Sequence, residues 1–369
     1  MLIASSLINN FKNINNLNFT WGPGINFISG PNGSGKTNLL EALNILSGWG
    51  TFRSRARDCV NWSLDNGRAY LAAEVKHNTN LAKGVDIDLY RDLFGADNNY
   101  KITAQISSQI NLKLDDKKIS STDLRLIIPS IAFQPQDINL IEGSPAVRRL
   151  FIDKLCALYF PPYAKRLAEF KTIARHRAAL LRQCRSVNVT DLPFANLGGY
   201  VMEARRIVLN QLRGNFENLL KFNKLKAVNF KFCLVPEIDI NNNLQCNEYL
   251  LNLLHDADYI ARERGAMRIL IGPSHDDLKI LINDRAAADA LSRGQKRRLV
   301  LYLIIAAGYL ISSKLRTRPV LLFDDLAAEL DNKNLKICAE ALLNTGWQIF
   351  ITGTDDLLPE FEKNIYAMA

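Results

Sequence analysis

Short apolar runs separated by glycine- and asparagine-rich turns occupy both ends of the chain, and this pattern predicts strands. Longer segments with apolar residues at helical spacing occupy the middle. In the first third the expected strands are 2–8, 17–21, 25–29, 70–76 and 85–90, with a helix over 36–46. In the last third the expected strands are 268–271, 278–282, 319–323 and 347–352, around a buried helix over 299–311.

Two helical patterns in the middle, 163–185 and 197–222, are separated by a short break at 191–193. This arrangement predicts an antiparallel helical pair that projects from the core. A strand over 227–235 and a helix over 248–265 complete the segment. We therefore expect an α/β head with a mixed sheet and an inserted α-helical arm. The expected division is 1–140 for the N-terminal part of the head, 141–264 for a mainly helical basic insertion and 265–369 for the C-terminal part of the head.

The charge of the chain is concentrated in this insertion. The 369 residues carry a net charge of +9, and residues 141–226 contain sixteen Lys or Arg against six Asp or Glu. That segment has a net charge of +10, so the remainder is close to neutral. A basic excess on one segment indicates an anionic partner, although a solvated helix surface has the same composition.

Nothing in the sequence predicts a membrane or secreted protein. The apolar run at 299–311 is too short to span a bilayer, and the N-terminus lacks a signal-peptide pattern. The six cysteines are scattered without metal-ligand spacing, which is typical of reduced cysteines in the cytoplasm. We expect a cytoplasmic protein with no membrane contact.

The strand at 25–29 runs into a phosphate-loop pattern, G-x-x-x-x-G-K-[ST], that a helix follows. Glycines let successive N–H groups point into one concavity, and the helix start favours an anion. Lys36 is expected to reach the outer phosphates of ATP, and the Thr37 hydroxyl is expected to ligate Mg²⁺. The expected ATP-binding residues are Gly30, Pro31, Asn32, Gly33, Ser34, Gly35, Lys36 and Thr37.

The apolar strand at 319–323 ends in two aspartates, as a Walker B strand does. A continuous apolar run predicts a strand buried on both faces, and its carboxyl end is where open α/β sheets bind ligands. Asp324 is therefore expected to hold Mg²⁺ together with Thr37. Asp325 is expected to orient or deprotonate the attacking water, so Asp324, Asp325 and Lys36 are the candidate catalytic residues.

Residues Leu291, Ser292, Arg293, Gly294 and Gln295 match the L-S-x-G-Q signature of ABC-type ATPases. Ser292 and Gln295 also form a capping box, which starts a helix for local reasons, and the two interpretations are compatible. In ABC-type enzymes the signature contacts the γ-phosphate held by the partner protomer. The resemblance therefore implies that two protomers enclose ATP, and that ATP drives homodimerisation.

Three further positions have roles implied by the same resemblance. Asp331 lies where such proteins have a loop that communicates across the dimer, and Thr352 lies in place of the switch histidine. Gln134 or Gln136 is expected to sense the γ-phosphate, with a slight preference for Gln134.

Several motifs in this order, together with the chain length, resemble the RecF family of the SMC/ABC-type ATPase group. They are Phe11–Ile14, the phosphate loop, Gly143–Pro145 with Arg148 and Arg149, Gly272–Pro273 with Asp276–Asp277, Leu291–Gln295, and Asp324–Asp325 with Glu329–Asp331. The departures from the family pattern are Ser274 and His275 within the Gly-Pro motif, Ala328 before Glu329, and Gln136 where an acidic residue is common.

The resemblance implies an ATP-dependent DNA-binding recombination mediator with weak, DNA-stimulated ATPase activity used as a switch. Such a protein binds duplex, gapped or junction DNA and helps load RecA with RecO and RecR in gap repair and replication restart, which also implies association with the nucleoid. The candidate DNA-binding residues are Arg148, Arg149, Arg175, Arg177 and Arg182, with Arg53, Arg55 and Arg57 next.

The alternative is an ATP-binding subunit of another ABC-type complex. In a transporter subunit the signature follows the phosphate loop by about a hundred residues, whereas here Lys36 and Ser292 enclose a long helical insertion. A nuclease-associated ATPase requires a further acidic metal cluster, and none is evident after Asp331. A structural SMC protein requires a much longer coiled coil than 141–226 can form.

Overall fold

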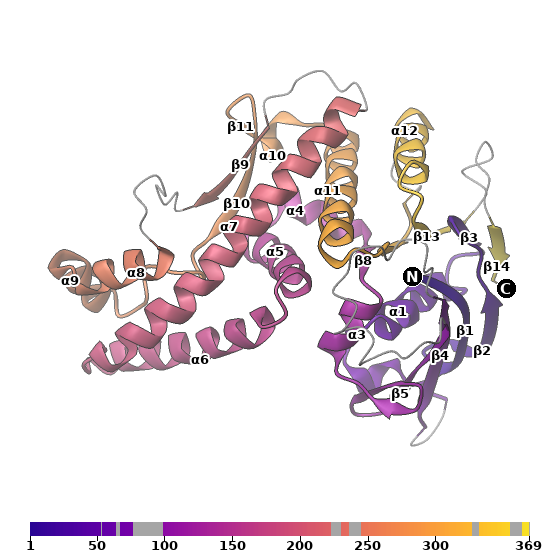
Figure 1. Cartoon of the computed structure of the whole chain (residues 1–369), viewed down its shortest axis with the longest axis horizontal. Coiled ribbons are helices and arrows are strands. Elements are labelled where there is room, and N and C mark those ends of the chain that lie inside the picture. The colour runs from indigo at the N-terminus through magenta and orange to yellow at the C-terminus, as the bar shows by residue number, and fades with distance from the viewer. Residues whose placement is uncertain are drawn as a thin grey trace. The chain divides into compact units, whose positions relative to one another are not determined.

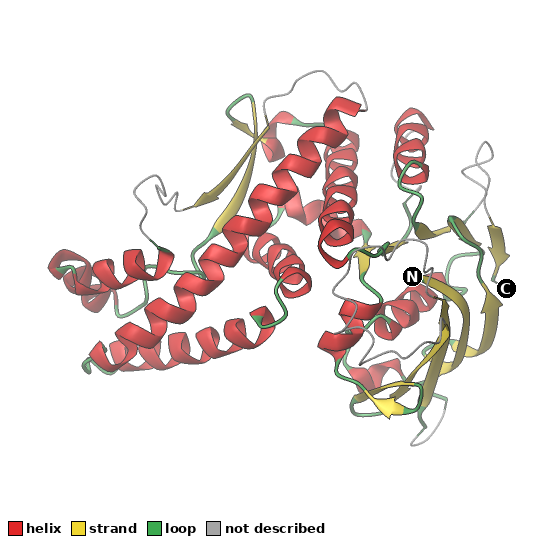
Figure 2. Cartoon of the chain, viewed as in Figure 1, coloured by secondary structure: helices red, strands yellow, loops and turns green. Residues whose placement is uncertain are grey.

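The computed structural model describes residues 1–52, 54–63, 67–76, 99–222, 230–235, 245–326, 332–354 and 364–368, with the backbone alone at 221–222, 230–235 and 332–335. The chain divides into two compact units. Unit 1 comprises residues 1–137 and 292–369, and unit 2 comprises residues 138–291. Figure 1 shows the chain by position, and Figure 2 shows that helices make up most of unit 2.

Unit 1 contains a five-stranded parallel sheet that carries the ATPase motifs. Its order is β14 (Asn364–Ala367), β3 (Ile25–Ser29), β13 (Gln348–Gly353), β12 (Val320–Phe323) and β8 (Ser130–Phe133). Every residue of β12 and β13 is buried, which explains why both strands are apolar almost without interruption. Helix α1 (Lys36–Leu46) contacts β12 and β13 and so follows β3 onto the sheet.

A second, antiparallel sheet covers the other side of α1. Its order is β2 (Ile14–Thr20), β1 (Leu2–Phe11), β4 (Ala69–Lys76), β5 (Asn99–Ile106), β6 (Ile110–Leu114) and β7 (Lys117–Lys118). Short helices η1 (Ala56–Cys59), α3 (Ser121–Ile127) and η3 (Pro135–Ile138) connect these elements. Leu39, Leu43 and Ile8 belong to one buried cluster that joins α1 to this sheet. The strand expected at 85–90 lies outside the described residues.

Helix α11 (Arg293–Leu315) extends beyond both ends of the helix that the apolar run predicted over 299–311. Among the described residues it is the one helix long and apolar enough to cross a membrane, but 67% of its apolar window is buried inside the protein. It contacts β8 and α12 (Asn332–Leu343), so it is a core helix of unit 1. The buried helix expected from the sequence is therefore present.

Unit 2 is built on two long helices, α6 (Tyr163–Arg182) and α7 (Asp191–Phe222), which run side by side in opposite directions (Figure 1). Helices α4 (Asn139–Glu142), α5 (Pro145–Tyr159), η4 (Asn188–Thr190), α8 (Cys246–His255), α9 (Ala257–Ala266) and α10 (Ala287–Ala290) pack around them. A small antiparallel sheet has the order β11 (Arg285–Ala286), β10 (Asp277–Ile282) and β9 (Phe230–Val235).

Unit 2 extends further along the chain than the insertion expected at 141–264. Strand β10 pairs with β9, from Asp277 opposite Val235 to Ile282 opposite Phe230, and so belongs to the arm rather than to the head. The second boundary therefore lies after residue 291. The pairing of two short strands from distant segments leaves no local signal in the sequence, which is why the boundary was misplaced.

Local expectations also failed at three points in unit 2. Residues 268–271 form no strand. Helix α7 begins at Asp191 and includes Pro193, because a proline in the first turn removes an N–H group that has no intrahelical partner. The helix expected at 248–265 is two helices, since Asp256 interrupts it and caps α9 by accepting a hydrogen bond from the Tyr259 N–H.

Candidate functional site: the phosphate loop and its neighbours

The loop between β3 and α1 has the backbone geometry of an anion site. Gly33 and Gly35 have φ angles of 87° and 102°, which side chains rarely adopt, and Gly35 is the residue before the first turn of α1. The Ser34 hydroxyl oxygen is buried without a hydrogen-bond partner. The Lys36 ammonium donates hydrogen bonds to the carbonyl oxygens of Gly30 and Pro31, at 2.6 and 2.8 Å, so it lies against the loop. A buried hydroxyl without a partner beside a cation fits a phosphate group.

The turn between β1 and β2 braces this loop, a role that sequence reasoning missed. The Asn13 amide donates to the Gly33 carbonyl oxygen at 2.9 Å, and its oxygen accepts from the Asn38 amide at 2.7 Å. A Cβ atom on Gly35 would lie 2.9 Å from the same Asn13 oxygen, so a glycine is required there for space as well as for φ. The sequence signal was the Phe11–Ile14 motif, whose residues were noted only for their family resemblance.

The same turn also fixes α1 from the side. Lys12 forms an ion pair with Glu41, whose side chain is buried in α1. The second carboxylate oxygen of Glu41 accepts a hydrogen bond from the Phe52 N–H at 2.8 Å. Because both oxygens of a buried carboxylate are satisfied, the start of α1 is held in register with the antiparallel sheet.

Three neighbouring strands bring the Walker residues together at one edge of the parallel sheet. The Thr37 hydroxyl donates to Asp324 Oδ1 at 2.9 Å, and the Thr352 hydroxyl donates to the same oxygen at 3.0 Å. The Asp325 N–H in turn donates to the Thr352 hydroxyl oxygen at 2.9 Å. Thr37 follows β3, Thr352 ends β13 and Asp324 follows β12, in the spatial order β3, β13, β12. The pairing of Thr37 with Asp324 is as the sequence predicted.

This donor set fits a magnesium ion. A hydroxyl and a carboxylate oxygen are hard ligands of the kind Mg²⁺ prefers, and Mg²⁺ takes its remaining ligands from water and phosphate. Asp324 is buried, whereas Asp325 is exposed and has a left-handed φ of 52°. Across the described residues no group of three or more His, Cys, Asp or Glu side chains is arranged to hold another metal.

The glutamines expected to sense the γ-phosphate lie at the same sheet edge, after β8. The Gln134 N–H donates to an Asp137 carboxylate oxygen at 2.7 Å, and the side-chain amide of Gln136 donates to the side-chain oxygen of Gln134. Because the two amides are paired, the structure does not separate them as candidates. Asp331, like Ala328, Glu329 and Leu330, lies outside the described residues.

The signature residues form the exposed start of α11. The Ser292 hydroxyl accepts from the Gln295 N–H at 3.4 Å, and the Gln295 side-chain oxygen accepts from the Ser292 N–H at 3.0 Å. The capping box read from the sequence is therefore present. Ser292, Arg293 and Gln295 are exposed at this helix start, where the positive end of the helix dipole favours an anion. Leu291 closes the segment assigned to unit 2, and Gly294 is partly buried.

The candidate DNA-binding arginines fall into two groups. Arg175 and Arg182 are exposed on α6, where their guanidinium groups contact backbone carbonyl oxygens of their own helix. Arg177 is completely buried, contrary to the sequence-based expectation. Its guanidinium forms ion pairs with Asp191 and Glu263, which neutralise the charge inside unit 2. Arg177 is therefore a structural residue and not a DNA contact.

Arg148 and Arg149 are partly buried and connect α5 to β10. Arg148 forms a bidentate ion pair with Asp277, at 2.7 and 3.0 Å, and Arg149 donates to the Asp276 carbonyl oxygen at 2.7 Å. The guanidinium of Arg148 is held by Asp277 and the Gly143 carbonyl oxygen, so a DNA contact by Arg148 requires exchange of a partner.

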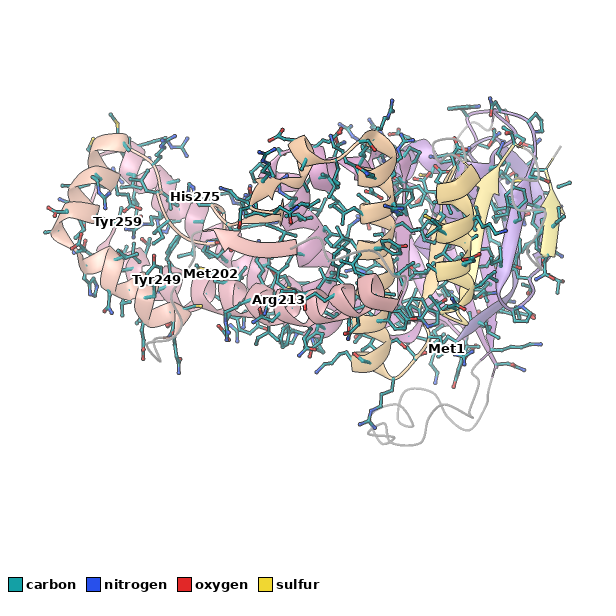
Figure 3. All side chains as sticks on the ribbon, turned by 90° about the horizontal axis from the view of Figure 1, so that it is seen from above. Met1, Met202, Arg213, Tyr249, Tyr259 and His275 are labelled. Atoms are coloured by element: carbon teal, nitrogen blue, oxygen red, sulfur yellow. The ribbon has the colours of Figure 1, made fainter. Side chains whose placement is uncertain are left out.

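A buried arginine that the sequence did not suggest organises the same region. Arg205 binds both oxygens of Asp153, and it donates to the Asp276 carboxylate at 2.8 Å and to the Pro273 carbonyl oxygen at 2.6 Å. Burial lowers the pKa of Arg205, but the surrounding Tyr163, Asp153 and Asp276 raise it above its ordinary value overall. The Gly272–Asp277 motif is thus a structural connection within the arm. Ser274 and His275, which depart from the family pattern, are both exposed. Figure 3 labels His275.

Comparison with known proteins finds similarity over almost the whole chain. The family model described as "RecF/RecN/SMC N terminal domain" matches residues 2–368. The DNA replication and repair protein RecF of Leptospira interrogans serovar Lai is 30% identical over 361 residues, covering 96% of this chain and 92% of that protein. The protein of the same name from Herpetosiphon aurantiacus is 30% identical, with 100% and 97% covered.

Solved structures show the same fold. A structure of the recombination mediator protein RecF with ATP, from the RecFOR pathway, has a TM-score of 0.79 at 24% identity, with 98% of this chain and 93% of that chain covered. An Smc head bound to the C-winged helix domain of ScpA has a TM-score of 0.52 at 16% identity, with 96% and 90% covered. The head fold is thus the one shared by RecF and SMC ATPases.

Proposed function

The chain belongs to the RecF family, and on that premise we propose that it is an ATP-dependent recombination mediator that dimerises on ATP and binds DNA. The observation that carries this proposal is the shared oxygen of Asp324, which joins the phosphate-loop strand to the Walker B strand through Thr37 and Thr352. ATP and Mg²⁺ are the ligands that this arrangement fits.

Each part of the site has a defined task in the proposal. The glycine turn and the unpaired Ser34 hydroxyl bind the phosphates, while Lys36 exchanges its carbonyl partners for phosphate oxygens. Thr37 and Asp324 hold Mg²⁺, and exposed Asp325 orients the attacking water. Bound Mg²⁺ supplies neutralisation of the phosphate charge.

Dimerisation follows from the exposed signature. Ser292, Arg293 and Gln295 are exposed at the start of α11. We assign the γ-phosphate of ATP, bound to a second copy of the chain, as the group that contacts this helix start. Two copies then enclose two ATP molecules, and hydrolysis releases them. We expect this hydrolysis to be slow and stimulated by DNA, so that it acts as a switch.

The test is sedimentation analysis with and without ATP and a gapped duplex. Lys36→Met removes the cation at the phosphates and should abolish both ATP binding and dimerisation. Ser292→Arg should preserve ATP binding by the monomer and block dimerisation alone. A Lys36→Met protein that still dimerises with ATP contradicts the assignment of the phosphate loop. Loss of ATP binding in Ser292→Arg contradicts the assignment of the signature.

DNA binding is assigned to the exposed basic face of α6. Its exposed cations are Lys165, Arg166, Lys171, Arg175 and Arg182. Such side chains contact phosphates without reading sequence, and binding weakens steeply as salt rises. The double charge reversal Arg175→Glu with Arg182→Glu should weaken duplex binding and flatten its salt dependence. Arg213→Glu, exposed further along α7, is the matched control (Figure 3).

Partnership with RecO and RecR in loading RecA is part of the same proposal. It is supported by family membership and by the likeness to solved structures of the recombination mediator protein RecF in the RecFOR pathway. Purified RecO and RecR are therefore the proteins to test for binding. Failure of both to bind the ATP-loaded dimer would contradict this part of the proposal and leave the ATP site standing.

A further inference from the structure

One end of unit 2 exposes large apolar side chains that the interior of unit 2 does not cover. Val189 in η4 is 74% exposed, Leu192 in the first turn of α7 is 58% exposed, and Met267 at the end of α9 is 52% exposed. Among the described residues only six large apolar side chains are at least 52% exposed, so three at one end form a concentration. We call the end formed by η4, the start of α7 and the end of α9 the arm tip.

Buried polar contacts bring the three segments of the arm tip together. Arg177 pairs with Asp191, which adjoins Leu192, and it donates to the Thr190 hydroxyl at 2.9 Å next to Val189. The same guanidinium pairs with Glu263 of α9, and Met267 is the residue that directly follows this helix. The arm tip is therefore held by an internal ion pair.

Two further contacts close the arm tip from the other side. The Tyr259 hydroxyl donates to Glu263 at 3.0 Å, so both oxygens of that buried carboxylate have partners. A Cβ atom on Gly272 would lie 3.1 Å from the Phe194 ring, which brings the chain after α9 back against α7. The exposed apolar side chains thus stand on a rigid support, and a partner does not have to order it on binding.

Arginines border these apolar side chains. Arg182 and Arg185 are exposed at the end of α6, and Arg264 and Arg268 are exposed on either side of Met267. Exposed acidic groups on α9 are confined to its start, at Asp256 and Asp258. The border is therefore basic, while the centre is apolar.

This combination selects the chemistry of the partner. A DNA backbone would pair with the arginines but would leave the valine, leucine and methionine in water. We propose that the arm tip docks a folded protein whose contact face has an apolar centre and a border of carboxylates. Apolar burial then supplies affinity, and the charges supply orientation and association rate. The inference relies on the proposed function only in taking RecO and RecR as the candidate proteins.

The test compares two variants of the full-length chain for binding to purified RecR and, separately, purified RecO. The first carries Leu192→Asp and Met267→Asp, which place carboxylates where the partner is expected to be acidic. The second carries Leu150→Asp, a matched control, because Leu150 in α5 is also 58% exposed in unit 2 but lies away from the arm tip (Figure 1). Urea unfolding and ATP-driven dimerisation are measured for both.

We expect the arm-tip variant to lose at least tenfold in affinity for one of the two proteins, while the control stays within twofold. Dimerisation with ATP should be unchanged in both variants, which separates this inference from the assignment of the ATP site. Equal binding by the arm-tip variant and the wild type would overturn this proposal and leave the partnership proposed above standing. Binding of neither protein to the wild type would overturn both. Loss of duplex binding with protein binding retained would instead identify the arm tip as a DNA surface.

Discussion

The Thr352 hydroxyl offers the sharpest test of how the site is assembled. It donates to Asp324 Oδ1 and accepts from the Asp325 N–H, so one oxygen connects the proposed magnesium ligand to the backbone of the proposed base. Thr352→Val keeps the size and branching of the side chain and removes both hydrogen bonds. Thr352→Ser keeps the hydroxyl and is the matched control.

The size of the effect follows from these two contacts. The hydrogen bond to the Asp324 carboxylate is one to a charged group and contributes about 1.5–3 kcal/mol, while the one from the exposed Asp325 contributes about 0.5–1.5 kcal/mol. Thr352 is 1% exposed, so water does not replace the lost partner. Asp325 has a left-handed φ of 52°, which is disfavoured by about 1–2 kcal/mol, and without its acceptor it is free to relax.

We therefore expect Thr352→Val to lower the free energy of unfolding by about 2–4 kcal/mol in urea titrations. A displacement of Asp325 worth about 2–3 kcal/mol would reduce kcat for ATP hydrolysis by roughly 30- to 150-fold. The KM for ATP should change little, because the phosphate loop and Lys36 are untouched. Thr352→Ser should restore most of kcat.

The refuting result is specific. If Thr352→Val hydrolyses ATP at the wild-type rate while its stability falls, the bridge supports folding and does not position the base. If KM rises and kcat is unchanged, Thr352 contributes to nucleotide binding instead, as a residue in the place of the switch histidine would.

Three further outcomes are expected. Arg177→Met should lower the free energy of unfolding by about 3–5 kcal/mol, because it leaves two buried carboxylates unpaired. Arg175→Met, at an exposed position, should change the free energy of unfolding by less than about 0.5 kcal/mol. Equal urea midpoints for the two variants would contradict the buried network. Gly35→Ala should weaken ATP binding more than Asn13→Ala does in a filter-binding assay. The alanine side chain would clash with Asn13 and would also be strained at a φ of 102°. If Asn13→Ala had the larger effect, the hydrogen bonds of Asn13 would be the main constraint on the loop. Iodoacetamide at neutral pH should modify exposed Cys184 before Cys246, because burial and nearby Glu203 raise the pKa of the Cys246 thiol to about 12. Peptide mapping that shows Cys246 modified first would contradict its burial.

The elements around the candidate ATP site could be predicted from the sequence because each of them has a local signal. The expected strand over 25–29 and helix over 36–46 match β3 and α1 residue for residue, since glycines, an apolar run and a helical period all occur together there. The contact between Thr37 and Asp324 also followed, because carboxyl ends of neighbouring parallel strands meet at one edge.

Contacts between distant segments could not be predicted in this way. Asn13 braces the phosphate loop from a turn 20 residues before Gly33, and no local pattern marks an asparagine as a brace. Arg177 lies in a helix with exposed arginines on either side, and the helical period alone does not show that Glu263, 86 residues later, faces it. The pairing of β9 with β10 is of the same kind, and it moved the boundary of the arm.

The buried arginines change what the net charge of the arm means. Arg148, Arg177 and Arg205 are each neutralised by carboxylates within unit 2, so they add to the charge count of 141–226 without adding to the field at its surface. Three of the acidic partners, Glu263, Asp276 and Asp277, lie outside that segment, which is why its composition overstates the exposed charge. The field that remains comes from exposed cations, and α6 carries five of them along one helix. Each DNA phosphate that a cation neutralises should contribute about −0.9 to the slope of the logarithm of the binding constant against the logarithm of the salt concentration. The slope measured for duplex binding should therefore reflect the number of exposed cations on α6, and not the net charge of +10 counted for residues 141–226.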